Sequence, residues 1–402
     1  MKITALETVQ VPDRRNLLWV RLHTDEGIVG LGESFRGADT VAAYLHDQVA
    51  PYLLGADPLA IEKHSRHLLQ NYLGFGGTSA EVRAASAIDI ALWDIFGKAT
   101  NKPIHQLLGG LSREKIRAYN TCAGYSYNAK GPVRAEYVPW EPAPTPAGPY
   151  DDQMNFCHRP EELAQSLIEE GFQAMKIWPI DPFAARTGGI DISLADLKMG
   201  LEPFERIRRA VGDKIEIAAE LHSMWGLHAA LKIARGLKPF NPLWSEDPIK
   251  MDAIPALAEY RRLSGLPVCA SETLATRTQF RDLLVQEACD IVMLDIGWCG
   301  GISEARKIGA MAEAFSKPIT PHDCTGPVVL TASVHIAMHL PNAIFQEVVR
   351  AYLATWYKDL VTVLPRLEKG FVYPMTGPGL GTELQPDVLK RKDIIVRTTK
   401  AS

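Results

Sequence analysis

Three short apolar runs between residues 215 and 272 each end on a glutamate: Ile215-Glu216-Ile217-Ala218-Ala219-Glu220, Leu243-Trp244-Ser245-Glu246 and Val268-Cys269-Ala270-Ser271-Glu272. Successive terminal glutamates are 26 residues apart in both intervals. Short apolar runs separated by amphipathic helical patterns are typical of parallel strands joined by helices. Glu220, Glu246 and Glu272 therefore occupy the same place in three successive strand-helix repeats.

The same rhythm extends over most of the chain. After residue 110, eight apolar runs alternate with helical patterns: 116–119, 174–178, 215–219, 243–245, 268–271, 291–294, 319–321 and 344–346. Eight strand-helix repeats predict an α/β fold, a (β/α)8 barrel of the TIM type. A doubly wound sheet is the alternative, but no Gly-x-Gly-x-x-Gly sequence follows a strand.

The first 110 residues have a different pattern. Alternating segments at residues 2–11, 17–22 and 27–32 predict a small antiparallel sheet, and helical patterns follow at residues 41–53, 60–69 and 80–97. We therefore expect a separate N-terminal α+β unit. A proline-rich insert at residues 125–159 follows the first barrel strand, and its aromatic residues favour an ordered lid over a disordered linker.

Composition excludes several classes of protein. The 402 residues are 47% apolar and carry 43 basic and 47 acidic residues, so disorder over most of the chain is excluded. No basic block predicts binding to a nucleic acid or a membrane surface, and no apolar run is long enough to span a bilayer. The start lacks the pattern of a secretory signal, and the six cysteines form no Cys-x-x-Cys pair. We expect a cytoplasmic protein with reduced cysteines and a small-molecule partner.

The three strand-end glutamates predict a metal site. In a barrel their oxygens converge at one mouth, where three anions repel each other unless a cation holds them. Hard oxygen ligands suit Mg²⁺ better than zinc. A single strand-end glutamate is better explained by helix capping or a surface ion pair, but three at equal spacing are not. We expect one Mg²⁺ per site.

Further ionisable residues follow the sixth, seventh and eighth strands. Asp295 and His322 predict a general-base dyad, because a neighbouring carboxylate holds an imidazole in one tautomer. Alone, His322 would more often be a structural histidine. Glu347 either donates a hydrogen bond to a developing oxyanion, if its pKa is raised, or anchors its neighbours.

Lys176 and His222 complete the set of candidate catalytic residues. Lys176 ends the second strand, where burial and a nearby metal would lower its pKa and suit it for work as a base or electrophile. The alternative is a salt bridge from Lys176 to a metal-binding carboxylate. His222 lies two residues beyond Glu220, so an extended backbone would direct both side chains to one side. His222 is then an acid, or else a positioning or loop residue.

Such a set of groups suits removal of a proton next to a carboxylate. That proton is weakly acidic, and the enediolate left behind needs a divalent cation and hydrogen-bond donors. A lysine or histidine base with Mg²⁺ is the arrangement that enolase-superfamily sites use.

Several phrases resemble the mandelate racemase and muconate-lactonising group of the enolase superfamily. They are the run from Ala84 to Lys98, Leu107 to Gly110, Ser245-Glu246-Asp247-Pro248, Ser271-Glu272, Gly300-Gly301-Ile302 and Pro378-Gly379-Leu380-Gly381. The resemblance implies a capping domain at residues 1–125, completed by the tail 371–402, and a barrel at residues 126–370. It also implies that the first capping loop covers the substrate. Arg14 and Arg15 are then candidates for a distal substrate contact, or else solvated loop cations, and Trp298 is a further candidate.

The resemblance also implies roles for the strand-end residues. Glu220, Glu246 and Glu272 match the metal ligands of the family, and Asp295 with His322 matches its dyad. Lys176 matches the second lysine of a Lys-x-Lys pair, in which Ala174 replaces the first. This departure argues against simple transfer of the mandelate racemase reaction.

Two bases on opposite faces, Lys176 and His322, would allow racemisation, whereas an additional acid allows loss of water. Because His222 supplies such an acid, we predict a Mg²⁺-dependent dehydratase of a sugar acid, an aldonate or aldarate. It would remove the proton next to the carboxylate and then eliminate water to give a 2-keto-3-deoxy acid. A racemase, epimerase or cycloisomerase acting through the same enediolate is the first alternative, and a non-catalytic binding protein is the second. A metal-dependent amidohydrolase would need His-x-His after the first strand, where the chain has Tyr119-Asn120-Thr121. The resemblance to the family also implies a homo-oligomer.

Overall fold

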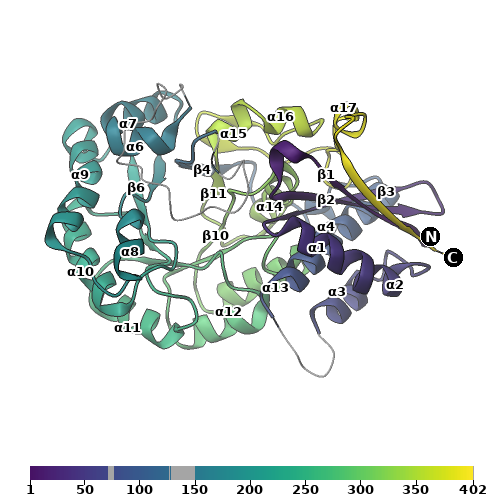
Figure 1. The fold of residues 1–402 in the computed structure, drawn as a ribbon, viewed down its shortest axis with the longest axis horizontal. Coiled ribbons are helices and arrows are strands. Elements are labelled where there is room, and N and C mark those ends of the chain that lie inside the picture. Colours follow the sequence, from purple (N-terminus) through teal and green to yellow (C-terminus); the bar gives the residue numbers. More distant parts are fainter. Residues whose placement is uncertain (71–76, 126, 128–149, 402) are drawn as a thin grey trace.

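The computed structural model describes residues 1–70, 77–125, 127 and 150–401. An N-terminal sheet with its helices lies beside a larger ring of strands and helices (Figure 1). In the described part of the chain, no helix is long and apolar enough to cross a membrane.

The N-terminal sheet is antiparallel and has the strand order β14-β1-β2-β3. Its strands are β1 (Ile3–Gln10), β2 (Leu17–Thr24), β3 (Val29–Phe35) and β14 (Ile395–Lys400). The first three strands confirm the predicted sheet. The last strand is paired with the first, with Ala5 opposite Lys400, so the end of the chain completes this sheet.

The long helix α4 (Ala80–Thr100) packs against β3. Close approach requires glycine on the strand, because a Cβ at Gly30 or Gly32 would lie 2.2 or 1.9 Å from a backbone oxygen of the helix. Preceding α4 are α1 (Ala38–Tyr44), the π-helix η2 (Leu45–Val49), α2 (Ala50–Leu53) and α3 (Ile61–Leu69).

Buried polar residues of α4 join the N-terminal part to the rest of the chain. Asp94 accepts hydrogen bonds from the backbone of Leu31 and Leu380, both at 2.9 Å. Asp89 accepts one from the backbone of Ser303 at 2.9 Å, on the barrel helix α13 (Gly301–Ala314). Asp89, in the run from Ala84 to Lys98 that resembles the family, therefore joins the N-terminal part to the barrel.

The ring contains the eight predicted barrel strands. They are β4 (Ile116–Thr121), β5 (Ala174–Ile177), β6 (Glu216–Glu220), β7 (Ser245–Glu246), β8 (Val268–Ala270), β9 (Ile291–Leu294), β10 (Ile319–Pro321) and β11 (Gln346–Val348). Neighbouring strands are parallel from β4 to β10, and β11 pairs with β4 on the other side. A parallel bridge between Ile319 and Ala343 lies between the two ends of this order. The barrel prediction is confirmed.

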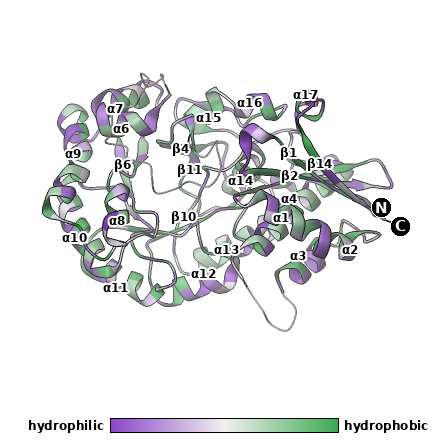
Figure 2. Cartoon of the chain, viewed as in Figure 1, coloured by the Kyte–Doolittle hydropathy of each residue, from purple (hydrophilic) through white to green (hydrophobic). Residues whose placement is uncertain are grey.

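Helices surround the barrel strands (Figure 1). They are α7 (Pro160–Glu169), α9 (Leu194–Val211), α10 (Leu227–Leu237), α11 (Ile254–Ser264), α12 (Thr276–Val285), α13 and α14 (Pro327–His339), with the short α8 (Asp181–Thr187) after β5. Each of these helices carries both polar and apolar residues (Figure 2). In α10 the buried residues Ala230, Ile233 and Leu237 recur at helical spacing, which places one apolar face against the barrel.

An apolar cluster fills part of the barrel. Tyr119 makes edge contacts with Trp244 and Phe345, and their neighbours are Ala174, Ala218, Cys269, Ile291 and Met293. Ala174 is the residue that replaces the first lysine of the family pair. Its place in this cluster shows that the position belongs to the apolar core of this protein.

Other elements lie before β4, between β4 and β5, or after β11. They are α5 (Ile104–Leu108), α6 (Asp152–His158), α15 (Arg350–Ala354), α16 (Tyr357–Leu360), β12 (Leu367–Glu368), β13 (Phe371–Val372) and α17 (Pro386–Leu389). Most of the proline-rich insert at residues 125–159 lies outside the described residues, so its action as a lid stays a prediction. The domain boundary near residue 125 also stays a prediction.

Candidate active site

Glu220, Glu246 and Glu272 come together at the ends of β6, β7 and β8. One carboxylate oxygen from each lies within 4.8 Å of the other two. Glu220 and Glu246 lie opposite each other in the register of β6 and β7, whereas Glu246 is opposite Cys269 and Glu272 lies two residues beyond the end of β8. The predicted convergence of the three carboxylates is nevertheless present.

The three carboxylates fit a hard divalent cation. All their donor atoms are oxygens, which Mg²⁺ prefers. Glu220 accepts backbone hydrogen bonds at Oε1, whereas in the described structure its buried Oε2 faces only the ammonium group of Lys176, at 3.2 Å. Burial and the charge of Glu220 raise the pKa of Glu246 well above its usual range. A cation here would contact Oε2 of Glu220 and would offset the repulsion between the carboxylates of Glu220 and Glu246.

Lys176 lies among these carboxylates. Its Nζ is 2.5 Å from Glu246 Oε1, 2.8 Å from Glu347 Oε1 and 3.2 Å from Glu220 Oε2. Burial lowers the pKa of Lys176, but the charges of Glu246 and Glu347 outweigh burial and raise the pKa well above its usual range. The raised pKa follows from the several carboxylates that surround one ammonium group. The predicted lowering, which includes the effect of a nearby metal, stays a prediction. The alternative, salt bridges to the metal-binding carboxylates, is present.

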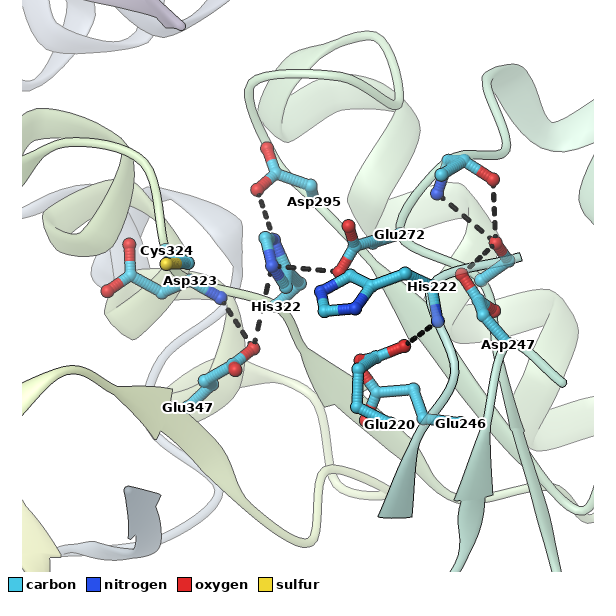
Figure 3. A network of polar contacts seen from close by, with 12 residues as sticks. Glu220, His222, Glu246, Asp247, Glu272, Asp295, His322, Asp323, Cys324 and Glu347 are labelled. Carbon is cyan, nitrogen blue, oxygen red and sulfur yellow. Dashed lines mark hydrogen bonds and ion pairs between the residues drawn. The ribbon is translucent and has the colours of Figure 1, made fainter. Parts of the chain in front are cut away.

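His322 and Asp295 form a hydrogen-bonded pair in the structure. His322 Nδ1 lies 2.7 Å from Asp295 Oδ2, and the other oxygen of Asp295 accepts a hydrogen bond from the backbone of Gly297. His322 Nε2 lies 2.9 Å from Glu272 Oε2, so the contacts join the pair to the carboxylate cluster in a row (Figure 3). Burial lowers the pKa of His322, but Glu272 and Glu347 raise it more strongly.

Glu347 acts as an acceptor on both oxygens. Oε1 forms the ion pair with Lys176, and Oε2 accepts a hydrogen bond from the backbone of Asp323 at 2.9 Å (Figure 3). These contacts fit an anchor between two strand ends. The alternative role, as donor to a developing oxyanion, stays a prediction.

His222 reaches the site by a different route from the one the strand pattern predicted. The strand ends at Glu220, and His222 has a left-handed backbone with φ 46°. Its ring makes an edge contact with Trp178, and its Nδ1 lies 2.5 Å from Asp181 Oδ2. Burial lowers the pKa of His222, but Glu220 and Asp181 raise it to about 9.

A pocket that is partly open to solvent lies beside these groups. It is lined by Phe35, Arg36, Thr121, Tyr127, Lys176, Trp178, His222, Glu272, Trp298, His322 and Cys324. We call it the chamber. The predicted residue Trp298 lies in it, with its ring 5.4 Å from that of His322.

Arg14 and Arg15 do not line the chamber. Arg14 lies over the ring of Trp356 at 4.4 Å and lines a second, smaller cavity, which shares Phe35 and Tyr127 with the chamber. Arg15 is exposed and lines neither of these cavities among the described residues. Substrate contact by the two arginines stays a prediction.

Three residues of the site were missed in the sequence. Asp181 follows β5 by four residues, and Arg36 follows a strand of the other sheet, so neither stands at a barrel strand end. Asp323 follows His322 directly, and neither of its buried carboxylate oxygens has a hydrogen-bond partner within the described part of the chain. Its position at the end of the seventh strand was a signal that the sequence contained.

Comparison with known families agrees with this geometry. Residues 3–109 match the N-terminal domain of mandelate racemase and muconate lactonizing enzyme, and residues 159–388 match an enolase C-terminal domain-like family. The chain belongs to the enolase superfamily.

Related members of the superfamily cover almost the whole chain. A D-galactonate dehydratase of Pectobacterium atrosepticum is 30% identical over 97% of this chain and 94% of that protein. The crystal structure of an enolase of the mandelate racemase subgroup from Agrobacterium tumefaciens is 52% identical, covers 100% of this chain and 99% of its own, and has a TM-score of 0.88. An enolase protein from Sargasso Sea environmental sequence is 47% identical, with the same coverage and the same TM-score. This enolase-superfamily protein thus shares both its domains with these relatives.

Proposed function

We propose that this protein is a Mg²⁺-dependent hydro-lyase that removes water from a sugar acid. The observation that carries the proposal is the arrangement of proton carriers in one chamber. His322 and His222 each have a carboxylate on Nδ1, and Lys176 lies beside the carboxylate cluster. The names of the curated relatives, D-galactonate dehydratases, support the same reaction class.

The acid end of the substrate would lie beside the carboxylate cluster once a cation offsets the negative charge of the cluster. A divalent cation held by Glu220, Glu246 and Glu272 would supply positive charge there and offset the Glu272 charge that raises the pKa of His322. The ammonium group of Lys176, which is held by its ion pairs, adds a second positive charge beside this cluster.

The two histidines would then move protons at neighbouring carbons. His322 Nε2 accepts the proton next to the carboxylate, while Asp295 on Nδ1 holds the ring in one tautomer. The electron pair of the broken C–H bond enters the enediolate and then expels the hydroxyl of the next carbon. His222 gives its proton to that hydroxyl, which leaves as water. The enol product becomes a 2-keto-3-deoxy acid.

The test is a substrate panel. Purified protein with Mg²⁺ is incubated with aldonates and aldarates, and keto-acid formation is measured by reaction with semicarbazide. We expect turnover of at least one acid, its loss with a chelator and its return with added Mg²⁺. Proton exchange from D₂O without a keto acid would instead show a racemase or epimerase. Neither product nor exchange across the panel would contradict the proposal.

A further inference from the structure

Two arginines of the N-terminal part meet at Trp298. The guanidinium carbons of Arg36 and Arg83 each lie 5.8 Å from the centre of the Trp298 ring. Within the described residues, neither arginine has an ion pair, and the buried Nε of Arg83 has no hydrogen-bond partner. Burial and the like charge of Arg36 both lower the pKa of Arg83. Positive charge therefore gathers here without a paired carboxylate.

The backbone presents Arg36 to the chamber at some conformational cost. The backbone of Arg36 has φ 69°, a left-handed conformation that residues other than glycine rarely adopt, and Gly37 follows with φ 66°. This turn at the end of β3 makes Arg36 part of the chamber lining, together with His322 and Glu272. Its side chain is exposed, so it is accessible to an anion that binds in the chamber.

The chamber thus has two regions of different chemistry. Near Lys176 and Glu272 lie the groups that fit a metal and a first carboxylate. Near Trp298 lies Arg36, whose guanidinium can bind a carboxylate through two parallel hydrogen bonds. The ring of Trp298 lies 5.4 Å from that of His322 and 5.8 Å from each guanidinium carbon, and its Nε1 donates to the Phe35 carbonyl at 3.3 Å, which fixes its place. A substrate with an acid group at each end would satisfy both regions.

We propose that the substrate is a dicarboxylate sugar acid, an aldarate, whose distal carboxylate binds Arg36, with Arg83 adding positive charge beside Trp298. This inference rests on the proposed function and names its substrate class. An aldarate and the aldonate of the same configuration differ only at the far end, where one has a carboxylate and the other a hydroxymethyl group. The pair therefore isolates the effect of the arginines.

The test compares kcat/KM for such a matched pair in three proteins. The unaltered protein should prefer the aldarate. Arg36→Ala should lower kcat/KM for the aldarate by ~10- to 100-fold, the range expected when a hydrogen-bonded charge pair is lost, and change that for the aldonate by less than about 3-fold. Arg209→Ala, which removes an exposed arginine of α9 that does not line the chamber, is the control and should change neither.

Arg36→Glu sharpens the result. It should reject the aldarate more strongly than Arg36→Ala does, because two like charges then face each other, and its aldonate activity reports that the protein is folded. Turnover of the aldonate alone, or equal losses for both acids in Arg36→Ala, would overturn this inference and leave the proposed function standing. Turnover of neither acid by the unaltered protein would overturn the proposed function and this inference with it.

Discussion

Two histidine–carboxylate pairs face the same chamber, and they differ in their access to water. The side chain of His322 is 5% exposed and that of Asp295 is fully buried. The side chain of His222 is 28% exposed and that of Asp181 is 14% exposed. The His322–Asp295 pair is thus almost completely buried, whereas the His222–Asp181 pair is partly exposed.

The difference indicates a division of labour. A buried imidazole held by one carboxylate keeps a single orientation, as removal of a weakly acidic proton requires. A partly exposed imidazole exchanges its proton with solvent, as repeated donation to a departing hydroxyl requires. His322 also touches the metal-binding residue Glu272, whereas His222 touches Trp178 and Asp181. Three variants or conditions test this division.

The largest effect is expected for the buried pair. His322→Asn should lower keto-acid formation by about 10³-fold, within the range that general-base catalysis contributes. It should also abolish exchange of the substrate proton with D₂O, because both measurements depend on the same proton removal. Exchange at the original rate would show that another group is the base, and the assignment of proton removal to His322 would then be wrong. Thermal unfolding of the variant serves as the check on folding.

A smaller and more selective effect is expected for the exposed pair. His222→Asn should lower keto-acid formation by about 10²-fold while leaving D₂O exchange largely intact, since loss of the hydroxyl comes after proton removal. The matched control is His228→Asn, which alters an exposed histidine of α10 whose side chain is 78% exposed. If exchange and elimination fell together in His222→Asn, the division between the two histidines would be wrong.

The smallest effect concerns stability in the presence of a chelator. The folded-state pKa of His222 is about 9 against an ordinary 6.5, so the folded state binds its proton more tightly than the unfolded state. The stabilisation is fully present below pH 6.5 and is lost as the pH rises to about 9. The difference in unfolding free energy between the unaltered protein and His222→Asn should therefore shrink across this window.

For His322, whose pKa is raised well above its ordinary value, the loss should likewise begin near pH 6.5 and continue to higher pH. Urea unfolding at several pH values measures both differences. Differences that do not change with pH would contradict the assigned charges of the two histidines.

Much of the barrel and of its strand-end residues was predictable from the sequence. Parallel strands repeat at regular spacing along the chain. The equal spacing of Glu220, Glu246 and Glu272 was therefore enough to predict that their carboxylates lie close together. Asp295 and His322 follow neighbouring strands, which was enough to predict their contact.

Other features depend on packing that no local pattern contains. Arg36 comes from the N-terminal sheet, and only the docking of that sheet on the barrel brings it to the chamber. Asp181 meets His222 because a loop residue takes a left-handed backbone, whereas the strand pattern predicted an extended one. The raised pKa of Lys176 could be predicted only with knowledge of all the carboxylates around its ammonium group, and these come from separate strands.

The pairing of β14 with β1 has a consequence for biosynthesis. The first strand of the protein leaves the ribosome early, but its partner consists of residues 395–400, almost at the end of the chain. Until those residues emerge, one edge of the sheet that carries Arg36 is open to other strands, which is a hazard for aggregation. The barrel has all its strands by residue 348, so a nascent chain would hold its catalytic carboxylates before its N-terminal sheet is finished.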